Sequence, residues 1–174
     1  MRGFCVISMT LLLCSGCAST PAVVVRSNVP YGSEIAVIGF RDCVIAEQED
    51  CGGSGNVAGS IFARVFSSTP AFKAVPLSRP IGPKDSLSDE SAVELAKSKG
   101  FKFVLNGEVD EYYSVAPMTF RTDRAGVSIR LLRSDDGAVV AFFSQRKEAA
   151  SNLSTPDAII QGMAERVRDK LSVK

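Results

Sequence analysis

The feature that most constrains the fold is the order in which strand-type and helix-type hydrophobic patterns follow one another after residue 33. Short apolar or alternating runs are typical of strands, whereas apolar residues spaced three or four apart indicate one face of a helix. The order is β-α-β-α-β-β-β-α, which predicts an α/β sandwich with a mixed sheet covered by helices. The predicted strands are 34–40, 72–77, 101–113, 126–131 and 138–145, and the predicted helices are 54–69, 88–99 and 155–171.

Local signals define the ends of these elements and their place in the sheet. Ser88 is a residue type that caps helix N-termini, and Gly100 suits the left-handed backbone that ends a helix. Pro76 lacks an amide hydrogen, so its strand is expected at a sheet edge or strand end. Asp136-Gly137 predicts a hairpin turn, because glycine readily adopts the positive φ that such turns need.

The first 16 residues have the composition of a secretory signal peptide. Met1-Arg2 precedes an apolar run that is too short to cross a bilayer, and small residues follow it. Ser15-Gly16 before Cys17 resembles the lipobox of bacterial lipoproteins, although Cys14 stands where a large aliphatic residue is usual. We predict that Cys17 is lipidated; an ordinary cleaved signal, and redox or metal chemistry of the C-x-x-C pair, are the alternatives. The expected division is 1–16 signal peptide, 17–33 lipid-anchored tether and 34–174 single α/β domain.

The cysteine and histidine counts bear on compartment and chemistry. Of five cysteines, only Cys43 and Cys51 remain once Cys5 and Cys14 are removed with the signal and Cys17 is acylated. Because exported proteins meet an oxidising compartment, we predict a disulfide between this pair, with two free thiols as the alternative. The chain has no histidine, which excludes Ser-His-Asp and Cys-His nucleophile systems and imidazole-based zinc sites. No cofactor or metal is expected.

The charge balance argues against binding to nucleic acid. The chain has 20 Lys+Arg and 19 Asp+Glu, so it lacks the excess of positive charge that phosphate backbones attract. No second long apolar run follows the signal, so only the N-terminal end is expected to meet lipid.

Residues at the end of the third predicted strand and in the loop after it are candidates for binding a partner protein. Loops that follow strands often carry binding surfaces, and exposed Tyr, Met and Phe are frequent at the centres of interfaces. Nearby arginines are candidates for a polar rim; a solvated loop, and a core role for one tyrosine and the phenylalanine, are the alternatives. The candidate residues are Tyr112, Tyr113, Met118, Phe120, Arg121 and Arg124.

The same strand carries carboxylates. Glu108 and Asp110 lie two positions apart, which places them on one face of the strand, with Glu111 expected on the opposite face. Such a pair acts as acid and base if its surroundings separate the two pKa values; a solvated strand face is the alternative. Gly107 in the middle of this strand predicts a bulge or a close approach of the backbone.

Four segments carry a resemblance to a known group: EIAVIGF, AKSKGFKFVLNGEVDEYY, AGVSIRLLRSDDGAVVAFF and TPDAIIQGMAERVRDKL. Over about residues 34–171 the chain resembles the domain shared by the curli secretion lipoprotein CsgG, the amino-terminal domain of TolB and the penicillin-binding-protein activator LpoB. Phe103 and Asp136 stand where this group commonly has tyrosine and threonine. The resemblance implies the α/β fold. It also implies binding to other envelope proteins or assembly into larger structures, without a shared catalytic residue.

We therefore expect a non-enzymatic lipoprotein of a Gram-negative envelope whose domain faces the periplasm. Ala18 and Ser19 follow the lipidated cysteine without the aspartate that retains lipoproteins at the inner membrane, which favours the outer membrane. The expected partner is a peptidoglycan synthase or a component of a secretion or motility apparatus. The alternatives are self-assembly into a ring or pore of an export apparatus, and an enzyme that acts on cell-wall sugars through Glu108 and Asp110.

Overall fold

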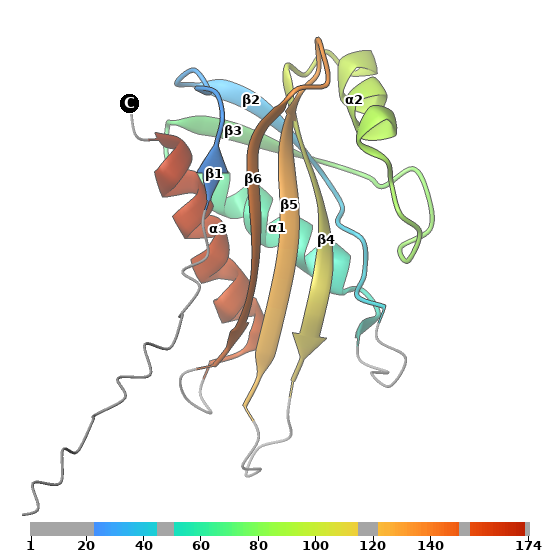
Figure 1. Ribbon diagram of the computed structural model, residues 1–174, viewed down its shortest axis with the longest axis vertical. Coiled ribbons are helices and arrows are strands. Elements are labelled where there is room, and N and C mark those ends of the chain that lie inside the picture. Colours follow the sequence, from blue (N-terminus) through green and yellow to red (C-terminus); the bar gives the residue numbers. More distant parts are fainter. Residues whose placement is uncertain (1–22, 45–50, 115–121, 150–153, 173–174) are drawn as a thin grey trace, which may run out of the picture.

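The computed structural model describes residues 23–44, 51–114, 122–149 and 154–172. These residues form one six-stranded sheet and three helices (Figure 1). The strands are β1 (Val24–Val25), β2 (Ser33–Ile38), β3 (Phe72–Leu77), β4 (Phe103–Tyr113), β5 (Arg124–Arg133) and β6 (Val139–Glu148). The helices are α1 (Ser54–Ser67), α2 (Asp89–Ser98) and α3 (Pro156–Ser172).

The sheet is mixed, with the strand order β1-β6-β5-β4-β2-β3. β2 pairs in parallel with β3 and β4, as expected for strands that are joined through the crossover helices α1 and α2. β4, β5 and β6 form an antiparallel meander. β3 lies at one edge of the sheet, where Pro76 was predicted to belong. Gly137 in the β5–β6 turn has φ 71°, which is the backbone conformation the hairpin prediction required.

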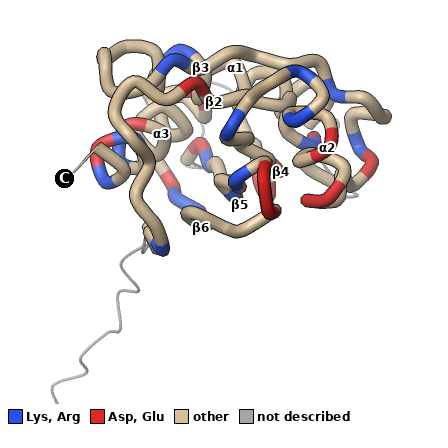
Figure 2. The backbone as a smooth tube through the Cα atoms, turned by 90° about the horizontal axis from the view of Figure 1, so that it is seen from above, with Lys and Arg blue, Asp and Glu red and all other residues tan. Residues whose placement is uncertain are grey.

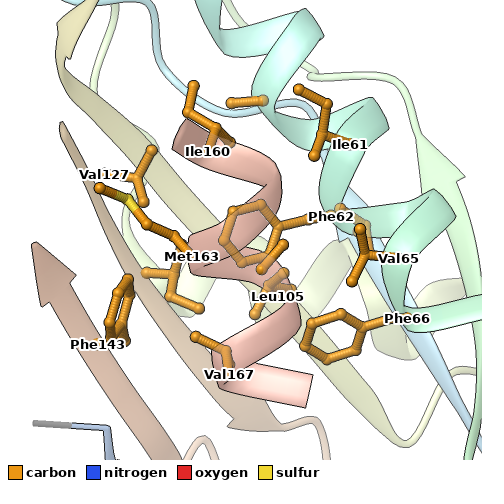
Figure 3. Packing of buried hydrophobic residues seen from close by; sticks show 14 of the residues in the cluster. Ile61, Phe62, Val65, Phe66, Leu105, Val127, Phe143, Ile160, Met163 and Val167 are labelled. Carbon is orange, nitrogen blue, oxygen red and sulfur yellow. The ribbon is translucent and has the colours of Figure 1, made fainter. Parts of the chain in front are cut away.

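The main core lies between the sheet and the helices α1 and α3, which cover the same face (Figure 1). Phe62 and Phe66 of α1 and Met163 of α3 pack with Leu105 of β4 and Phe143 of β6 (Figure 3), and all five side chains are fully buried. Burial of one such side chain contributes about 1.5–3 kcal/mol to folding. The apolar stripes predicted for both helices are therefore the surfaces that hold them on the sheet.

A smaller cluster lies on the opposite face of the sheet, under α2. Ala36, Ile38, Val104 and Leu132 of the strands are buried there against Ala92 and neighbouring residues of α2. Ser88 caps α2, its hydroxyl accepting a hydrogen bond from the Ser91 amide, as predicted. Because α2 is short, this cluster covers only one end of the second face, and the rest of β4, β5 and β6 is left without a covering helix.

The predicted α/β sandwich is confirmed, and the differences lie at its margins. β1 was not predicted: Val24 and Val25 pair with Phe142 and Ala141 of β6, and Val29 is 4% exposed. Residues 23–33, which the sequence assigned to the tether, therefore lie against the domain, since Val24 and Val25 add a strand to the sheet and Val29 is buried in the main core. β5 and β6 also extend further than predicted into charged residues, as strands with one solvated face do.

None of the three helices in the described part of the chain combines the length and the apolar character needed to cross a membrane. Residues 1–22, which include the predicted signal peptide and the predicted lipidation residue Cys17, lie outside the described residues.

Candidate functional site

The side of β4, β5 and β6 that faces away from α1 and α3 carries polar side chains, among them two of the predicted binding residues. We call its part beyond α2 the open face. Its side chains alternate along each strand with the buried residues of the main core. The open face consists of Glu108, Asp110, Glu111 and Tyr113 of β4, Arg124, Ser128 and Arg130 of β5, and Ser144 and Arg146 of β6.

A β-bulge in β4 shapes the open face. The register with β5 shifts between Val109 and Glu111, so Asp110 is an extra residue in the ladder. Asp110 accepts a hydrogen bond from the Ser128 hydroxyl at 2.8 Å, and Glu111 pairs with Arg124 at 3.4 Å. The expectation that Glu111 lies opposite Glu108 and Asp110 was therefore wrong, because the bulge turns three carboxylates toward one face.

Gly107 precedes the bulge and is where the predicted close approach is found. A Cβ atom at this position would lie 2.9 Å from atoms of the Phe40 ring, so only glycine fits without a shift of that ring. The bulge itself occurs three residues after the glycine, at Asp110. The close approach brings the middle of β4 against the segment that follows β2, where Arg41 bridges to Glu108.

The carboxylates of the open face are joined to cations or hydroxyls rather than to one another. Glu108 pairs with Arg41 at 2.7 Å, and both side chains are 30% exposed. Asp89 at the start of α2 pairs with Arg130 at 2.9 Å. Figure 2 shows the acidic segment of β4 beside basic positions of β5. Of the two residues considered as an acid and a base, Glu108 is paired with a cation and Asp110 is hydrogen-bonded by a hydroxyl, so both belong to an ordered, charged surface.

Tyr113 and Arg124 end the open face at the free end of the meander. The Arg124 guanidinium carbon lies 5.4 Å from the centre of the Tyr113 ring, within the range of a cation–π contact. The same guanidinium reaches Glu111. Tyr113 and Arg124, two of the six predicted binding residues, therefore lie together. Glu111, which was not among those six, forms an ion pair with Arg124.

Tyr112 lies on the other side of the sheet. It packs against the main core, and its hydroxyl donates to an Asp157 carboxylate oxygen at 2.6 Å near the start of α3. Burial, and then the hydrogen bond to Asp157, raise the pKa of the Tyr112 phenol above its ordinary value. The predicted core role for one tyrosine therefore belongs to Tyr112. The other three predicted binding residues, Met118, Phe120 and Arg121, lie outside the described residues.

The segment after β2 is hydrogen-bonded to the start of α1. The Asp42 carboxylate, 2% exposed, accepts hydrogen bonds from the amides of Gly53 at 2.8 Å and Gly55 at 2.7 Å. Carboxylates are favourable at helix N-termini, where amide groups lack intrahelical partners. Cys43 and Cys51 form the predicted disulfide beside this contact, with their Cα atoms 5.5 Å apart. The role of Asp42 was not predicted from the sequence, because the disulfide loop separates Asp42 from the helix whose first turn it contacts.

Arg79, which follows β3, stabilises the same region through hydrogen bonds. Its guanidinium donates to the carbonyl oxygens of Gly39 at 3.0 Å and Gly82 at 3.3 Å, and to that of Asp85. Burial, and then the neighbouring Arg41, lower the pKa of Arg79. Arg79 stabilises the loop after β3 through backbone carbonyls, and this is a structural role that its sequence context does not reveal.

The described residues contain no group of three or more Cys, Asp or Glu side chains placed to hold a metal ion. An acidic hollow of about 410 Å³ lies between α2 and the β5–β6 turn. Two of its carboxylates are already engaged, Asp89 by Arg130 and Asp136 by Arg133. The open face remains the surface that best matches the predicted binding residues.

Comparisons with known proteins relate the chain to others through its fold. No family model matches the chain, and no curated protein matches it. A single-residue variant of the PelC dodecamer from Paraburkholderia phytofirmans superposes with TM-score 0.69 at 19% identity, covering 89% of this chain and 99% of that chain. The lipoprotein GNA1162 from Neisseria meningitidis superposes with TM-score 0.51 at 17% identity, covering 80% and 98%.

The LpoB C-terminal domain from Salmonella enterica, a member of the group that the sequence resembles, superposes with TM-score 0.45 at 14% identity, covering 71% of this chain and 86% of that chain. The likenesses to PelC and to the lipoprotein GNA1162 establish that the chain shares its fold with these two proteins. They extend to the arrangement of the elements and not to particular site residues, because identities below a fifth leave few positions in common.

Proposed function

We propose that the chain is a lipid-anchored, non-enzymatic protein of a Gram-negative envelope that acts by binding protein partners with its periplasmic domain. The signal-peptide pattern that ends at Cys17 supports the anchor. The fold shared with the lipoprotein GNA1162 is consistent with such a protein. The absence of an aspartate after Cys17 supports the outer membrane as its location.

The observation that carries partner binding is the ordered charged surface of the open face, which ends in Tyr113 and Arg124. An ion pair that is held at a strand end, next to a partly exposed aromatic ring, has little side-chain freedom to lose when a partner binds. Tyr and Arg are also the residue types that dominate binding energy at protein interfaces. A peptidoglycan synthase, or a component of a secretion or motility apparatus, is the class of partner we propose.

In-cell crosslinking tests the surface directly. A photo-activated residue at Tyr113 should capture one discrete envelope protein, whereas the same residue at Lys170, exposed on α3 across the sheet, should not. Recovery of the same products from both positions, or of lipid alone, would contradict the proposal. The anchor is tested separately by palmitate labelling and by membrane fractionation. Cys17→Ser should abolish both the incorporation of palmitate and the recovery of the protein in the membrane fraction.

A second candidate function is self-assembly, and the likeness to a PelC dodecamer favours it. In that case the partner of the open face is a further copy of this chain, and the Tyr113 crosslinks yield multiples of its own mass. Sedimentation of the domain without its lipid discriminates between the two candidates. A defined oligomer supports assembly, and a monomer over the accessible concentration range would contradict it.

The third alternative, an enzyme acting on cell-wall sugars through Glu108 and Asp110, has less support. Glu108 is engaged by Arg41, and Asp110 accepts a hydrogen bond from Ser128. The purified domain is expected to release no product from cell-wall sugars; product release that is abolished by Glu108→Gln combined with Asp110→Asn in a folded protein would support this alternative instead.

A further inference from the structure

One edge of the sheet exposes three large apolar side chains, which we call the apolar edge: Val24 and Phe142, which lie opposite each other on one side, and Val25 on the other side of β1. The exposed fractions of Val24, Phe142 and Val25 are 42%, 39% and 38%. Single exposed hydrophobic residues are ordinary on protein surfaces, whereas neighbouring ones indicate a contact with another apolar phase. Half of the exposed large hydrophobic residues in the described part of the chain therefore lie at one place.

Two arginines flank the apolar edge. Arg26 follows β1 and is exposed, and Arg146 is exposed four positions after Phe142 on the same face of β6. Neither forms an ion pair with a residue that the structure describes. An apolar strip between unpaired guanidinium groups is the pattern of a surface that rests at the boundary between lipid headgroups and acyl chains.

The distance from the proposed anchor limits where this edge can be. Val24 is the seventh residue after Cys17. A fully extended chain spans at most about 3.3–3.6 Å per residue, so Val24 is held within roughly 25 Å of a lipid on Cys17. No other strand in the described part of the chain is tied so closely to that residue, because the next one, β2, begins at Ser33.

We propose that the apolar edge rests on the phospholipid surface that anchors Cys17, with Arg26 and Arg146 against anionic phosphate groups. This inference rests on the proposed lipidation of Cys17. The sheet then stands with β1 and β6 at the membrane and β3 farthest from it, since the strand order runs β1-β6-β5-β4-β2-β3. With strands about 4.8 Å apart, β3 lies on the order of 24 Å from β1 across the sheet.

The absence of tryptophan from the chain allows a clean fluorescence test. Phe142→Trp places a single reporter in the apolar edge, and Ile81→Trp is its matched control, because Ile81 is 38% exposed and follows β3 at the far edge. The lipidated chain is reconstituted in vesicles of phosphatidylethanolamine and phosphatidylglycerol, with and without brominated acyl chains.

Bromine should quench the Phe142→Trp reporter at least about twofold more than the Ile81→Trp reporter. Arg26→Gln combined with Arg146→Gln should reduce that quenching, and near-ultraviolet circular dichroism confirms that each variant is folded. Equal quenching of the two reporters, or none, overturns the proposal. A shift of the Phe142→Trp emission that depends on protein concentration without vesicles also overturns it, since a second copy then covers the edge.

Mass spectrometry of Cys17 in the same samples separates this proposal from that of the anchor. If Cys17 carries lipid and the Phe142→Trp reporter is not quenched, the anchor stands and the membrane contact of the edge is refuted. If Cys17 carries no lipid and the reporter is quenched on added vesicles, the contact stands and the anchor is refuted.

Discussion

At the scale of single residues, Asp42 connects the segment after β2 with the first turn of α1. Asp42→Ala leaves the amides of Gly53 and Gly55 without their carboxylate acceptor in a buried site. We expect the free energy of unfolding to fall by about 2–4 kcal/mol, measured by denaturant titration followed by circular dichroism. Asp135→Ala, in the exposed β5–β6 turn, is the control and should change it by less than about 0.5 kcal/mol. A loss of similar size in both variants would refute this role of Asp42.

Tyr112 makes a residue-scale prediction about pH. Its pKa is raised in the folded chain by burial and by Asp157, so folding favours the neutral phenol. A raised pKa contributes stability that is present below the unfolded pKa and is lost as the pH rises through the folded one. Absorbance titration should show one phenol that ionises at a higher pH than free tyrosine. This late phase of the titration should be missing in Tyr112→Phe. If that variant keeps the late phase, the phase belongs to another tyrosine and the prediction fails.

At the scale of elements, the periodic patterns and turn residues located every helix and every strand except β1. β1 was missed because two valines carry no periodic signal, and their pairing is to the distant strand β6. The site was only partly predictable. Strand alternation places Tyr112 and Tyr113 on opposite faces, whereas the bulge at Asp110 and the bridge between Arg41 and Glu108 depend on tertiary packing.

The disulfide belongs to this scale, because it closes the connection between β2 and α1. Cys43 and Cys51 are eight residues apart, and closure of so short a loop stabilises the folded state by about 2–3 kcal/mol through the unfolded chain. The double variant Cys43→Ser, Cys51→Ser should lose this amount in denaturant titration. A reductant should lower the free energy of unfolding of the native chain to that of the variant, and should leave that of the variant unchanged. If the reductant also destabilises the variant, the interpretation is refuted.

At the scale of the whole molecule, the domain begins earlier than its periodic patterns indicate. A chain that starts at residue 34 lacks β1 and the buried Val29. Its free energy of unfolding should be lower by about 1.5–3 kcal/mol than that of a chain that starts at residue 23. A chain that starts at residue 18 is the control and should match the latter in denaturant titration. Equal stability of all three chains would show that residues 23–33 contribute nothing to the fold.

The two edges of the sheet also limit how copies or partners attach. β3 carries Lys73 and Pro76 at one edge. At the other edge β1 pairs only with Ala141 and Phe142, and the end of β6 beyond that pairing carries Arg146, Lys147 and Glu148. Charged residues and proline at edge strands oppose the addition of further strands. Assembly is therefore expected to use side-chain surfaces such as the open face, rather than a sheet that continues from one molecule to the next.

The pairing of β1 with β6 has a consequence for the order of folding. It joins residues near the start of the described chain to Ala141 and Phe142 near its end, so its loop is among the longest that the sheet must close. Contacts between distant residues form late, because the entropy of the intervening chain must be lost first. We expect the segment from Val23 to Ser27 to stay accessible until β6 is in place. An enzyme that processes the N-terminal region would thus meet an unattached chain for most of the time that the domain takes to fold.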